Sequence, residues 1–291
     1  MKQQVKHILI TGAGSGLGRG LSLAFSQKGY HVIVTDRNLS TAAETISMIE
    51  VANSLSENPS PGPSPTRRGE KASPSFVGMG GGGLCTNHHA SSFALDVTSE
   101  SSIQRVIDEL ADTPIDVLIN NAGVQYVAQL EAFPQEKCDE VVDVILKGTC
   151  LMTRAVLPKM RGNGFGRIIN IASIHALVAS PYKSAYVAAK HGLLGFAKVI
   201  ALETADVDIT INSICPSYIH TPLVDAQIKN QAKVHNISEA EVINRIMLEP
   251  MPKRAFITIE EVAATAEFLM SDMARNITGQ TITIDGGWTA R

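Results

Sequence analysis

Three residues in the second half of the chain could together carry out acid–base chemistry. Tyr186 and Lys190 lie four positions apart, and Ser173 precedes Tyr186 by thirteen. If residues 183–205 form a helix, the Tyr186 and Lys190 side chains share one of its faces. A nearby ammonium favours a phenolate, so we expect Lys190 to lower the pKa of Tyr186 from its ordinary value near ~10. Tyr186 would then act as a general acid or base. The alternative is an ordinary helix that carries one Tyr and one Lys.

A glycine-rich segment near the N-terminus predicts a site for a phosphate group. An apolar run at 8–10 precedes Gly12, Gly16 and Gly18, and an apolar helical pattern follows them. Glycines let the backbone approach a ligand closely, and the free N–H groups at a helix start attract a pyrophosphate. The spacing differs from the usual dinucleotide pattern Gly-x-Gly-x-x-Gly, so the segment alone is weak evidence.

Asp36 favours NAD over NADP as the ligand of this segment. It ends a second apolar run at 32–35, about 20 residues beyond the glycines. A carboxylate there can accept hydrogen bonds from a ribose 2′-hydroxyl and would repel a 2′-phosphate. The alternative is a solvated carboxylate at the end of a strand.

Four motifs in order resemble the short-chain dehydrogenase/reductase family. They are Thr11-Gly12-x-x-x-Gly16-x-Gly18, Asn120-Asn121-Ala122-Gly123, Ser173, and Tyr186-x-x-x-Lys190. The resemblance covers nearly the whole chain apart from residues 54–90, and it implies that Ser173, Tyr186 and Lys190 are catalytic. The NAD-binding residues that it implies are Gly12, Ser15, Gly16, Leu17, Gly18, Asp36, Asp96, Val97, Asn121, Ala122, Gly123, Tyr186, Lys190, Pro216, Ile219 and Thr221. It also implies that residues 120–123 end the fourth strand and line the cofactor site.

The pattern of apolar runs predicts a single α/β domain over residues 1–291, with a Rossmann-like, doubly wound parallel sheet and helices on both faces. Expected strands are 6–11, 31–35, 92–95, 115–120, 166–172, 209–214 and 281–284. Expected helices are 16–28, 39–52, 99–111, 135–161, 183–205, 222–233, 238–248 and 259–271. Residues 218–248 are expected to form a substrate lid. Ligands of such sheets bind beyond the carboxyl ends of the strands.

Residues 54–90 interrupt this pattern with five prolines and the glycine run 80–83. Such a composition buries too little apolar surface to offset its chain entropy, so we expect a flexible surface insert. The alternative is a segment that binds a partner or covers the site.

Composition limits the classes of partner. The net charge is −3, which favours neither nucleic acid nor anionic lipid as a ligand. The four cysteines show neither a Cys-x-x-Cys pair nor the spacing of metal ligands, which predicts reduced thiols in the cytoplasm and no metal. The sequence contains no run of 18 apolar residues, so it predicts no membrane span. The family resemblance implies a homotetramer.

A second set of residues could hold an acid near Ser173. His175 and Lys183 are potential cations, and Gln125 and Gln227 are amide donors, which together suit a small carboxylate. Taken singly, each could be an ordinary polar side chain. The segments 171–192, 121–125, 221–227 and 285–290 resemble the D-3-hydroxybutyrate dehydrogenase branch of the family. That resemblance implies that Gln125, Ser173, His175, Lys183, Tyr186 and Gln227 bind 3-hydroxybutyrate or acetoacetate.

Three residues depart from the pattern that the resemblance implies. Ile145 stands where the family usually has an Asn that helps to place a water beside the catalytic lysine. Ser217 replaces a usual glycine, which we expect the fold to tolerate if its φ is negative. Tyr218 stands where this branch often has Trp, and we expect it to remain an aromatic wall. Two alternatives stay open: a family member that acts on another secondary alcohol or on a 3-oxoacyl substrate, and a catalytically weak NAD-binding protein.

Overall fold

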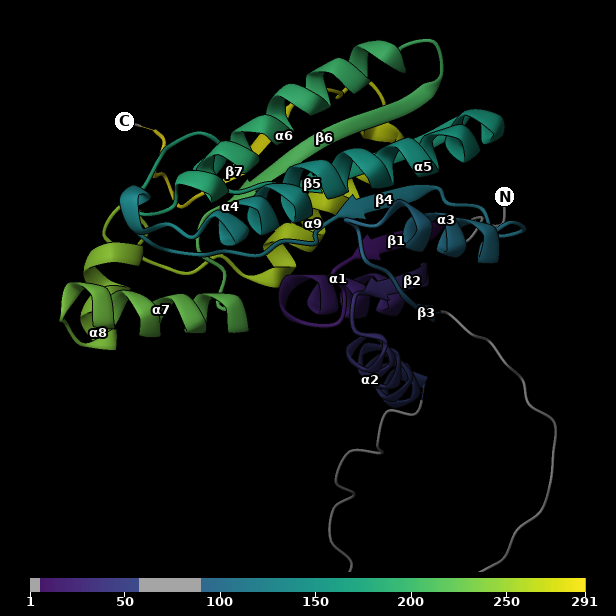
Figure 1. Cartoon of the computed structure of the whole chain (residues 1–291). Coiled ribbons are helices and arrows are strands. Elements are labelled where there is room, and N and C mark those ends of the chain that lie inside the picture. The colour runs from purple at the N-terminus through teal and green to yellow at the C-terminus, as the bar shows by residue number, and fades with distance from the viewer. Residues whose placement is uncertain (1–5, 58–89, 291) are drawn as a thin grey trace, which may run out of the picture.

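The computed structural model describes residues 6–57 and 90–290. At its centre lies a seven-stranded sheet in the order β3-β2-β1-β4-β5-β6-β7 (Figure 1). Every neighbouring pair of these strands is parallel. The Rossmann-like, doubly wound fold that the sequence predicts is therefore confirmed.

The strands are β1 (His7–Thr11), β2 (His31–Asp36), β3 (Ala90–Ala94), β4 (Val117–Asn120), β5 (Phe165–Ile171), β6 (Asp208–Pro216) and β7 (Thr281–Ile284). The α-helices are α1 (Gly16–Gln27), α2 (Leu39–Glu57), α3 (Glu100–Glu109), α4 (Gln135–Val142), α5 (Gly148–Asn163), α6 (Ser184–Glu203), α7 (Pro222–His235), α8 (Glu239–Glu241) and α9 (Ile259–Met270). Each expected strand is present within a few residues of its expected ends, and so is each expected helix except those at 135–161 and 238–248. Of the latter, only Glu239–Glu241 is α-helical, and a π-helical segment, Val242–Met247, continues it.

Two expected boundaries need correction. Helix α2 continues through Glu57, so residues 54–57, which composition placed in the insert, are helical. Strand β3 begins at Ala90, and residues 58–89 lie outside the described part of the chain. The long helix expected at 135–161 is divided by a π-helical segment, Asp143–Lys147, between α4 and α5.

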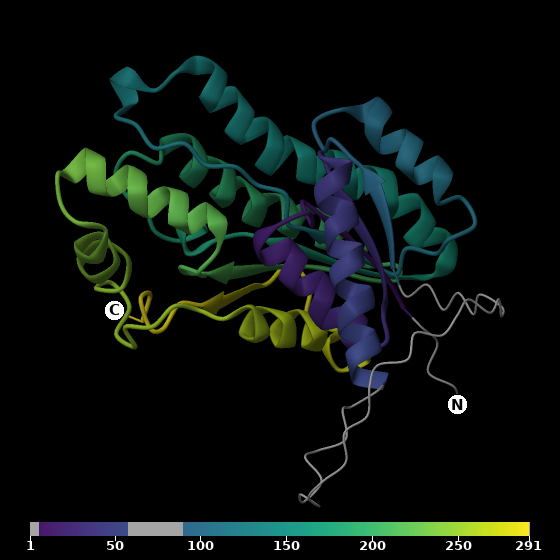
Figure 2. The ribbon, with the colours of Figure 1, turned by 90° about the horizontal axis from the view of Figure 1, so that it is seen from below.

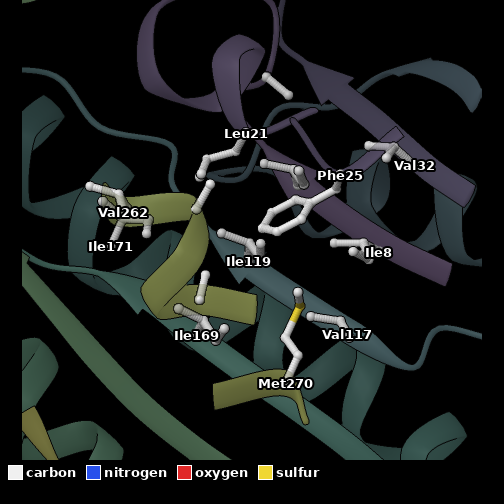
Figure 3. Packing of buried hydrophobic residues seen from close by; sticks show 14 of the residues in the cluster. Ile8, Leu21, Phe25, Val32, Val117, Ile119, Ile169, Ile171, Val262 and Met270 are labelled. Atoms are coloured by element: carbon white, nitrogen blue, oxygen red, sulfur yellow. The ribbon is translucent and has the colours of Figure 1, made fainter. Parts of the chain in front are cut away.

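Alternate residues of the strands face two separate apolar layers. Ile8, Ile10 and Val117 belong to the layer built with α1 and α9, whereas Leu9 and Leu118 belong to the layer built with α3, α5 and α6. Figure 3 shows the first layer, with Phe25 of α1 and Met270 of α9 over the β-sheet residues. Helices on both faces explain why β1, β2 and β4 each carry three consecutive apolar residues.

Helix α6 is largely apolar and carries few charged residues. By length and composition it could cross a membrane, but core helices pass the same test. Here it packs against β6 and α4, and its buried residues include Lys190. Packing inside the fold accounts for its buried apolar residues, whereas Val199 and Leu202 of this helix are exposed.

The strand order reverses between β1 and β4, which leaves a crevice beyond their carboxyl ends. In Figure 2 the arrowheads of β6 and β7 point toward the end of the molecule where α7 lies. Helix α7 and the short α8 extend from the layered body at this end (Figure 1). The lid predicted for 218–248 includes both helices.

Candidate active site

A cavity of about 500 Å³ lies beyond the carboxyl ends of the central strands. Residues that directly follow β1, β4, β5 and β6 line it. The cavity brings together most of the residues singled out in the sequence: Gly12, Ser15, Gly16, Leu17, Asn121, Gly123, Gln125, Ser173, His175, Lys183, Tyr186, Lys190, Pro216, Ile219, Thr221 and Gln227.

Other predicted residues lie outside its lining: Gly18, Asp36, Asp96, Val97, Asn120 and Ala122. The Asn120 side chain donates to Asn170 Oδ1 at 3.0 Å, so it joins β4 to β5 and does not line the cofactor site as expected. Asp96 Oδ1 accepts hydrogen bonds from the backbone and side chain of Thr98, and Val97 packs against Gly148. Contacts of Asp96 and Val97 with NAD therefore remain predictions.

The glycine-rich loop has the geometry of a phosphate cradle. Gly12 and Gly16 adopt positive φ values of 62° and 53°, which disfavour residues with a Cβ. A Cβ on Gly12 would lie 2.8 Å from Ala122 Cα, so the loop and the end of β4 are in close contact. Ser15, the N-cap of α1, makes no side-chain capping bond, and the first turn of α1 keeps N–H groups free for an anion.

Hydrogen bonds lock this loop to the neighbouring strand end. Asn121 Nδ2 donates to the carbonyls of Thr11 at 2.9 Å and Gly12 at 3.0 Å. Thr11 Oγ1 accepts from the backbone N–H groups of Asn121 and Ala122. Gly18 packs against the same residues, because a Cβ there would lie 2.5 Å from Asn121 Nδ2. Its role in the structure is thus close packing behind the loop.

Asp36 lies at the end of β2 beside the loop. Its Oδ2 accepts a hydrogen bond from Gly14 N at 3.0 Å, and its Oδ1 accepts one from Asn38 N at 3.0 Å. Each carboxylate oxygen keeps a second lone pair, so the group can still accept a bond from a ligand hydroxyl. This arrangement fits a dinucleotide with its pyrophosphate at α1 and its ribose near Asp36.

Ser173, Tyr186 and Lys190 meet at one wall of the cavity. Ser173 follows β5, and its Oγ accepts a hydrogen bond from His175 N at 3.1 Å. Lys190 is buried and donates from Nζ to the carbonyl of Ile171 at 2.6 Å. The Lys190 ammonium lies 5.6 Å from the centre of the Tyr186 ring.

The expectation that Lys190 lowers the pKa of Tyr186 is wrong for this state of the protein. Burial raises the Tyr186 pKa above its ordinary value, and a hydrogen bond with the Ser173 side chain opposes that rise. Burial also lowers the pKa of Lys190 to about 8. The main cause for both residues is desolvation, which disfavours the charged form of each group. Tyr186 is therefore a neutral phenol at pH 7.

His175 and Lys183 are buried side by side next to this wall, where the His175 ring meets the Tyr186 ring edge-on with ring centres 6.3 Å apart. Lys183 Nζ lies 3.2 Å from His175 Nε2 and donates to the Tyr218 hydroxyl at 3.3 Å. Burial and the adjacent Lys183 lower the pKa of His175 to about 3, so its expected role as a cation is wrong. Burial lowers the pKa of Lys183 to about 8, which leaves it charged at pH 7.

Lys183 has no anionic partner within the described ranges 6–57 and 90–290, where its polar neighbours are His175 and Tyr218. A buried charge without a counter-ion is costly, because the protein interior solvates it poorly. Gln125 and Gln227 hydrogen-bond to each other, while Gln125 Nε2 and Gln227 Oε1 are buried and have no partner among the described residues. This end of the cavity thus combines an uncompensated cation with an unused amide donor, as a carboxylate receptor requires.

The structure accommodates two of the departures in sequence. Ser217 has no positive φ, and its hydroxyl contacts Met251 Sδ at 2.8 Å. Ile145 is buried within the π-helical segment, and its carbonyl accepts a hydrogen bond from Thr149 Oγ1 at 2.7 Å. An apolar contact thus replaces the amide that the resemblance led us to expect at position 145.

Two residues of the site went unassigned in the sequence analysis. Trp288 stacks on Tyr218 at 6.1 Å between ring centres and meets His175 edge-on at 5.9 Å. Cys215 is buried next to Lys190 and Ser173, and burial raises the pKa of its thiol to about 11. Trp288 lies more than 100 positions from His175, so only its place in the C-terminal motif could have drawn attention to it. Tyr218 lines the cavity, as expected of an aromatic wall.

Known protein families match both parts of the chain. Residues 6–56 match the family described as short chain dehydrogenase, and residues 83–289 match the related family described as Enoyl-(Acyl carrier protein) reductase. The chain belongs to the short-chain dehydrogenase/reductase family. Folds of this family bind a nicotinamide cofactor, and the glycine-rich loop and the open first turn of α1 fit one.

Several relatives align over nearly their full length. A D-beta-hydroxybutyrate dehydrogenase of Rhizobium meliloti is 40% identical over 98% of this chain and 99% of its own. A second protein of that name, from Cupriavidus necator, is 36% identical over 98% of both chains. A 3-oxoacyl-[acyl-carrier-protein] reductase of Thermotoga maritima is 32% identical over 99% of both.

Solved structures of the family superpose well on this fold. A variant of actinorhodin polyketide ketoreductase with NADPH has a TM-score of 0.83 and 26% identity, with both chains fully covered. Sorbitol-6-phosphate 2-dehydrogenase of Erwinia amylovora has a TM-score of 0.81 and 27% identity, covering 97% of this chain and 99% of its own. The chain is therefore an oxidoreductase of this family.

No group of three or more His, Cys, Asp or Glu side chains that could hold a metal ion occurs in the described residues.

Proposed function

We propose that this protein is an NAD-dependent dehydrogenase that interconverts D-3-hydroxybutyrate and acetoacetate. The observation that carries the proposal is the buried ammonium of Lys183, which faces the same cavity as Ser173 and Tyr186 without an anionic partner in the described part of the chain. A substrate carboxylate would supply the missing negative charge. The relatives named D-beta-hydroxybutyrate dehydrogenase support this choice of acid.

Two neighbouring groups of side chains in the cavity fit the two ends of such a substrate. The carboxylate would accept hydrogen bonds from Lys183 and from the free amide of Gln125. This places the hydroxyl or ketone oxygen toward Ser173 and Tyr186, which line the same cavity next to His175. Fixing one end of a small molecule orients the other end for reaction, which lowers the entropic part of the barrier.

Ser173 and Tyr186 handle the proton and the developing charge on the substrate oxygen. In reduction, the neutral phenol of Tyr186 donates a proton to that oxygen, and Ser173 donates a hydrogen bond to it. In oxidation, the Tyr186 phenolate removes the hydroxyl proton. A bound nicotinamide dinucleotide supplies the hydride for reduction and accepts it in oxidation. Because the pKa of Tyr186 is raised, oxidation should accelerate as the pH rises.

NAD is the proposed cofactor because of Asp36. Its carboxylate lies beside the glycine-rich loop and would repel the additional phosphate of NADP. We also propose a homotetramer in the cytoplasm. Exposed apolar side chains on the outer face of α6, Val199 and Leu202, support burial of that helix between subunits. Sedimentation equilibrium would test the assembly.

The decisive experiment follows NADH absorbance with the purified protein. We expect turnover with NAD⁺ and D-3-hydroxybutyrate, much weaker turnover with the L enantiomer, and little with NADP⁺. Neutral secondary alcohols such as 2-butanol serve as controls, since they lack the carboxylate that Lys183 binds. Equal rates with 2-butanol and the acid would contradict the proposal.

A second candidate activity is reduction of a 3-oxoacyl thioester. The similarity to the Thermotoga maritima 3-oxoacyl-[acyl-carrier-protein] reductase favours it. A thioester carries no carboxylate for Lys183. Faster oxidation of a reduced cofactor with acetoacetyl-thioester than with acetoacetate would favour this activity. Absence of turnover with every substrate, despite NAD binding, would instead favour a protein that binds NAD with little catalysis.

A further inference from the structure

We infer that the hydroxyl of Tyr218 is a further substrate-binding group, which donates a hydrogen bond directly to the carboxylate held by Lys183. This inference rests on the proposed function, since it concerns the acid-binding end of the same cavity. The branch that the chain resembles often has Trp at this position, so the phenolic hydroxyl is a feature of this chain.

Packing fixes the Tyr218 ring. It is buried, stacks on Trp288 with an interplanar angle of 28°, and meets His175 edge-on with ring centres 6.3 Å apart. The Lys183 ammonium lies 5.3 Å from the centre of the same ring. A ring held on these sides has a defined position, so its hydroxyl is preorganised next to the Lys183 cation.

The proton of the Tyr218 hydroxyl is available to a ligand. Its oxygen accepts a hydrogen bond from Lys183 Nζ at 3.3 Å, and a charged ammonium cannot accept one in return. Burial raises the pKa of Tyr218, so the hydroxyl keeps its proton at neutral pH. In the described portion of the chain this hydroxyl donates no hydrogen bond. Tyr218 also lines the cavity, where a carboxylate bound to Lys183 would lie within its reach.

Tyr218 can donate a hydrogen bond that the neighbouring His175 Nε2 cannot. His175 Nε2 faces the Lys183 ammonium, so the neutral imidazole accepts there and offers no proton on that side. The carboxylate can therefore accept from Lys183 and Tyr218 together. A hydrogen bond to a charged group is among the stronger ones, and its loss weakens binding by roughly tenfold or more.

The test uses Trp288, which is the only tryptophan of the chain and touches Tyr218. The full-length protein saturated with NAD⁺ is titrated with acetoacetate, which cannot react with the oxidised cofactor, while Trp288 fluorescence is recorded. Four proteins are compared: the parent, Tyr218→Phe, Lys183→Met and the double variant. Tyr30→Phe is the matched control, because Tyr30 packs on Phe25 away from the cavity.

We expect Tyr218→Phe to weaken acetoacetate binding by roughly tenfold, and to weaken it by at least about threefold in the Lys183→Met background. Tyr30→Phe should bind acetoacetate as tightly as the parent protein does. The affinity for NAD⁺ should be the same in all of these proteins. Unchanged acetoacetate affinity in Tyr218→Phe would overturn the inference. So would a loss seen only when Lys183 is present, because Tyr218 would then act solely by positioning Lys183.

The same titration separates this inference from the proposed function. If the parent protein binds acetoacetate through Tyr218 but does not oxidise 3-hydroxybutyrate, the inference stands and the proposed reaction fails. If turnover occurs while Tyr218→Phe leaves both KM and acetoacetate affinity unchanged, the reaction stands and the inference fails. If the parent protein does not bind acetoacetate at all, both the inference and the proposed function are contradicted.

Discussion

The two ends of the cavity are built in different ways. The cofactor end is formed largely by backbone, where Gly12 and Gly16 turn with positive φ and Asn121 satisfies the carbonyls of the loop. The acid end is formed by side chains, and it contains the buried charge of Lys183 and the unpaired amide atoms of Gln125 and Gln227. The carbonyls of the loop are thus satisfied within the chain, whereas the buried charge of the acid end needs a ligand to balance it.

This difference teaches where specificity resides. A cradle of backbone N–H groups at a helix start recognises any pyrophosphate and can be shared by a whole family. A set of buried side chains that lack partners recognises one kind of charge. A ligand without that charge leaves the free-energy cost of burying these polar groups without compensation. Changes at the two ends should therefore have separable effects on cofactor and acid.

The largest effect is expected at the junction of the two ends, where Tyr186 transfers the proton. Tyr186→Phe should lower kcat by at least about 10²-fold, because no other group replaces the phenolic proton. Affinity for NAD⁺, measured by calorimetry, should remain within about twofold, since the phenol is one of many contacts that the cofactor would make. Retained turnover would remove Tyr186 from its assigned role.

Lys183→Met tests the acid end alone. It should raise KM for 3-hydroxybutyrate by at least about 30-fold, as expected when one partner of a buried charge pair is lost, with NAD⁺ affinity unchanged. The same change should raise the Tm of the ligand-free protein by a few degrees, because it removes a buried charge whose pKa is lowered to about 8. A lower Tm would show that the Lys183 hydrogen bonds outweigh its desolvation.

The pH dependence of acid binding should report the same charge. Lys183 binds a carboxylate only when protonated, and its pKa in the ligand-free protein is about 8. KM for 3-hydroxybutyrate should therefore be constant below pH 7 and rise with pH above about 8, by up to tenfold per unit. A bound anion shifts this rise to higher pH. In Lys183→Met, KM should no longer rise with pH. A rise of KM that persists in this variant would show that another group titrates.

Gly12→Ala tests the cofactor end. Gly12 has a positive φ, which disfavours alanine. A Cβ at this position would also lie 2.8 Å from Ala122 Cα, a backbone atom that cannot move as freely as a side chain. The strain costs of the order of 1–3 kcal/mol, so NAD⁺ affinity should fall by about tenfold. Acetoacetate binding to the cofactor-free protein, read from Trp288 fluorescence, should change much less. Equal losses for both ligands would show that the two ends are coupled.

The sequence predicted which residues gather at the cavity better than it predicted their charge states. Glycine spacing and strand order are local or periodic features, so the fold and the residues around Gly12 and Asn121 could be read directly. The charge states of His175 and Tyr186 could not, because they depend on how deeply packing buries each group. Trp288 and Tyr218 come together only through the tertiary fold, so their stacking has no signal in the spacing of residues.

The smallest expected effect is at Ser217, which stands where the family usually has glycine. A glycine is required only where φ is positive or a Cβ would clash, and Ser217 has no positive φ and directs its hydroxyl to Met251. Ser217→Gly should therefore change kcat and KM by less than about threefold, and should lower stability by up to ~1 kcal/mol through added chain entropy. Thermal unfolding and steady-state kinetics would measure both. A large gain in turnover would mean instead that the Ser217 side chain hinders cofactor binding, and that the cofactor end, too, departs from its family pattern.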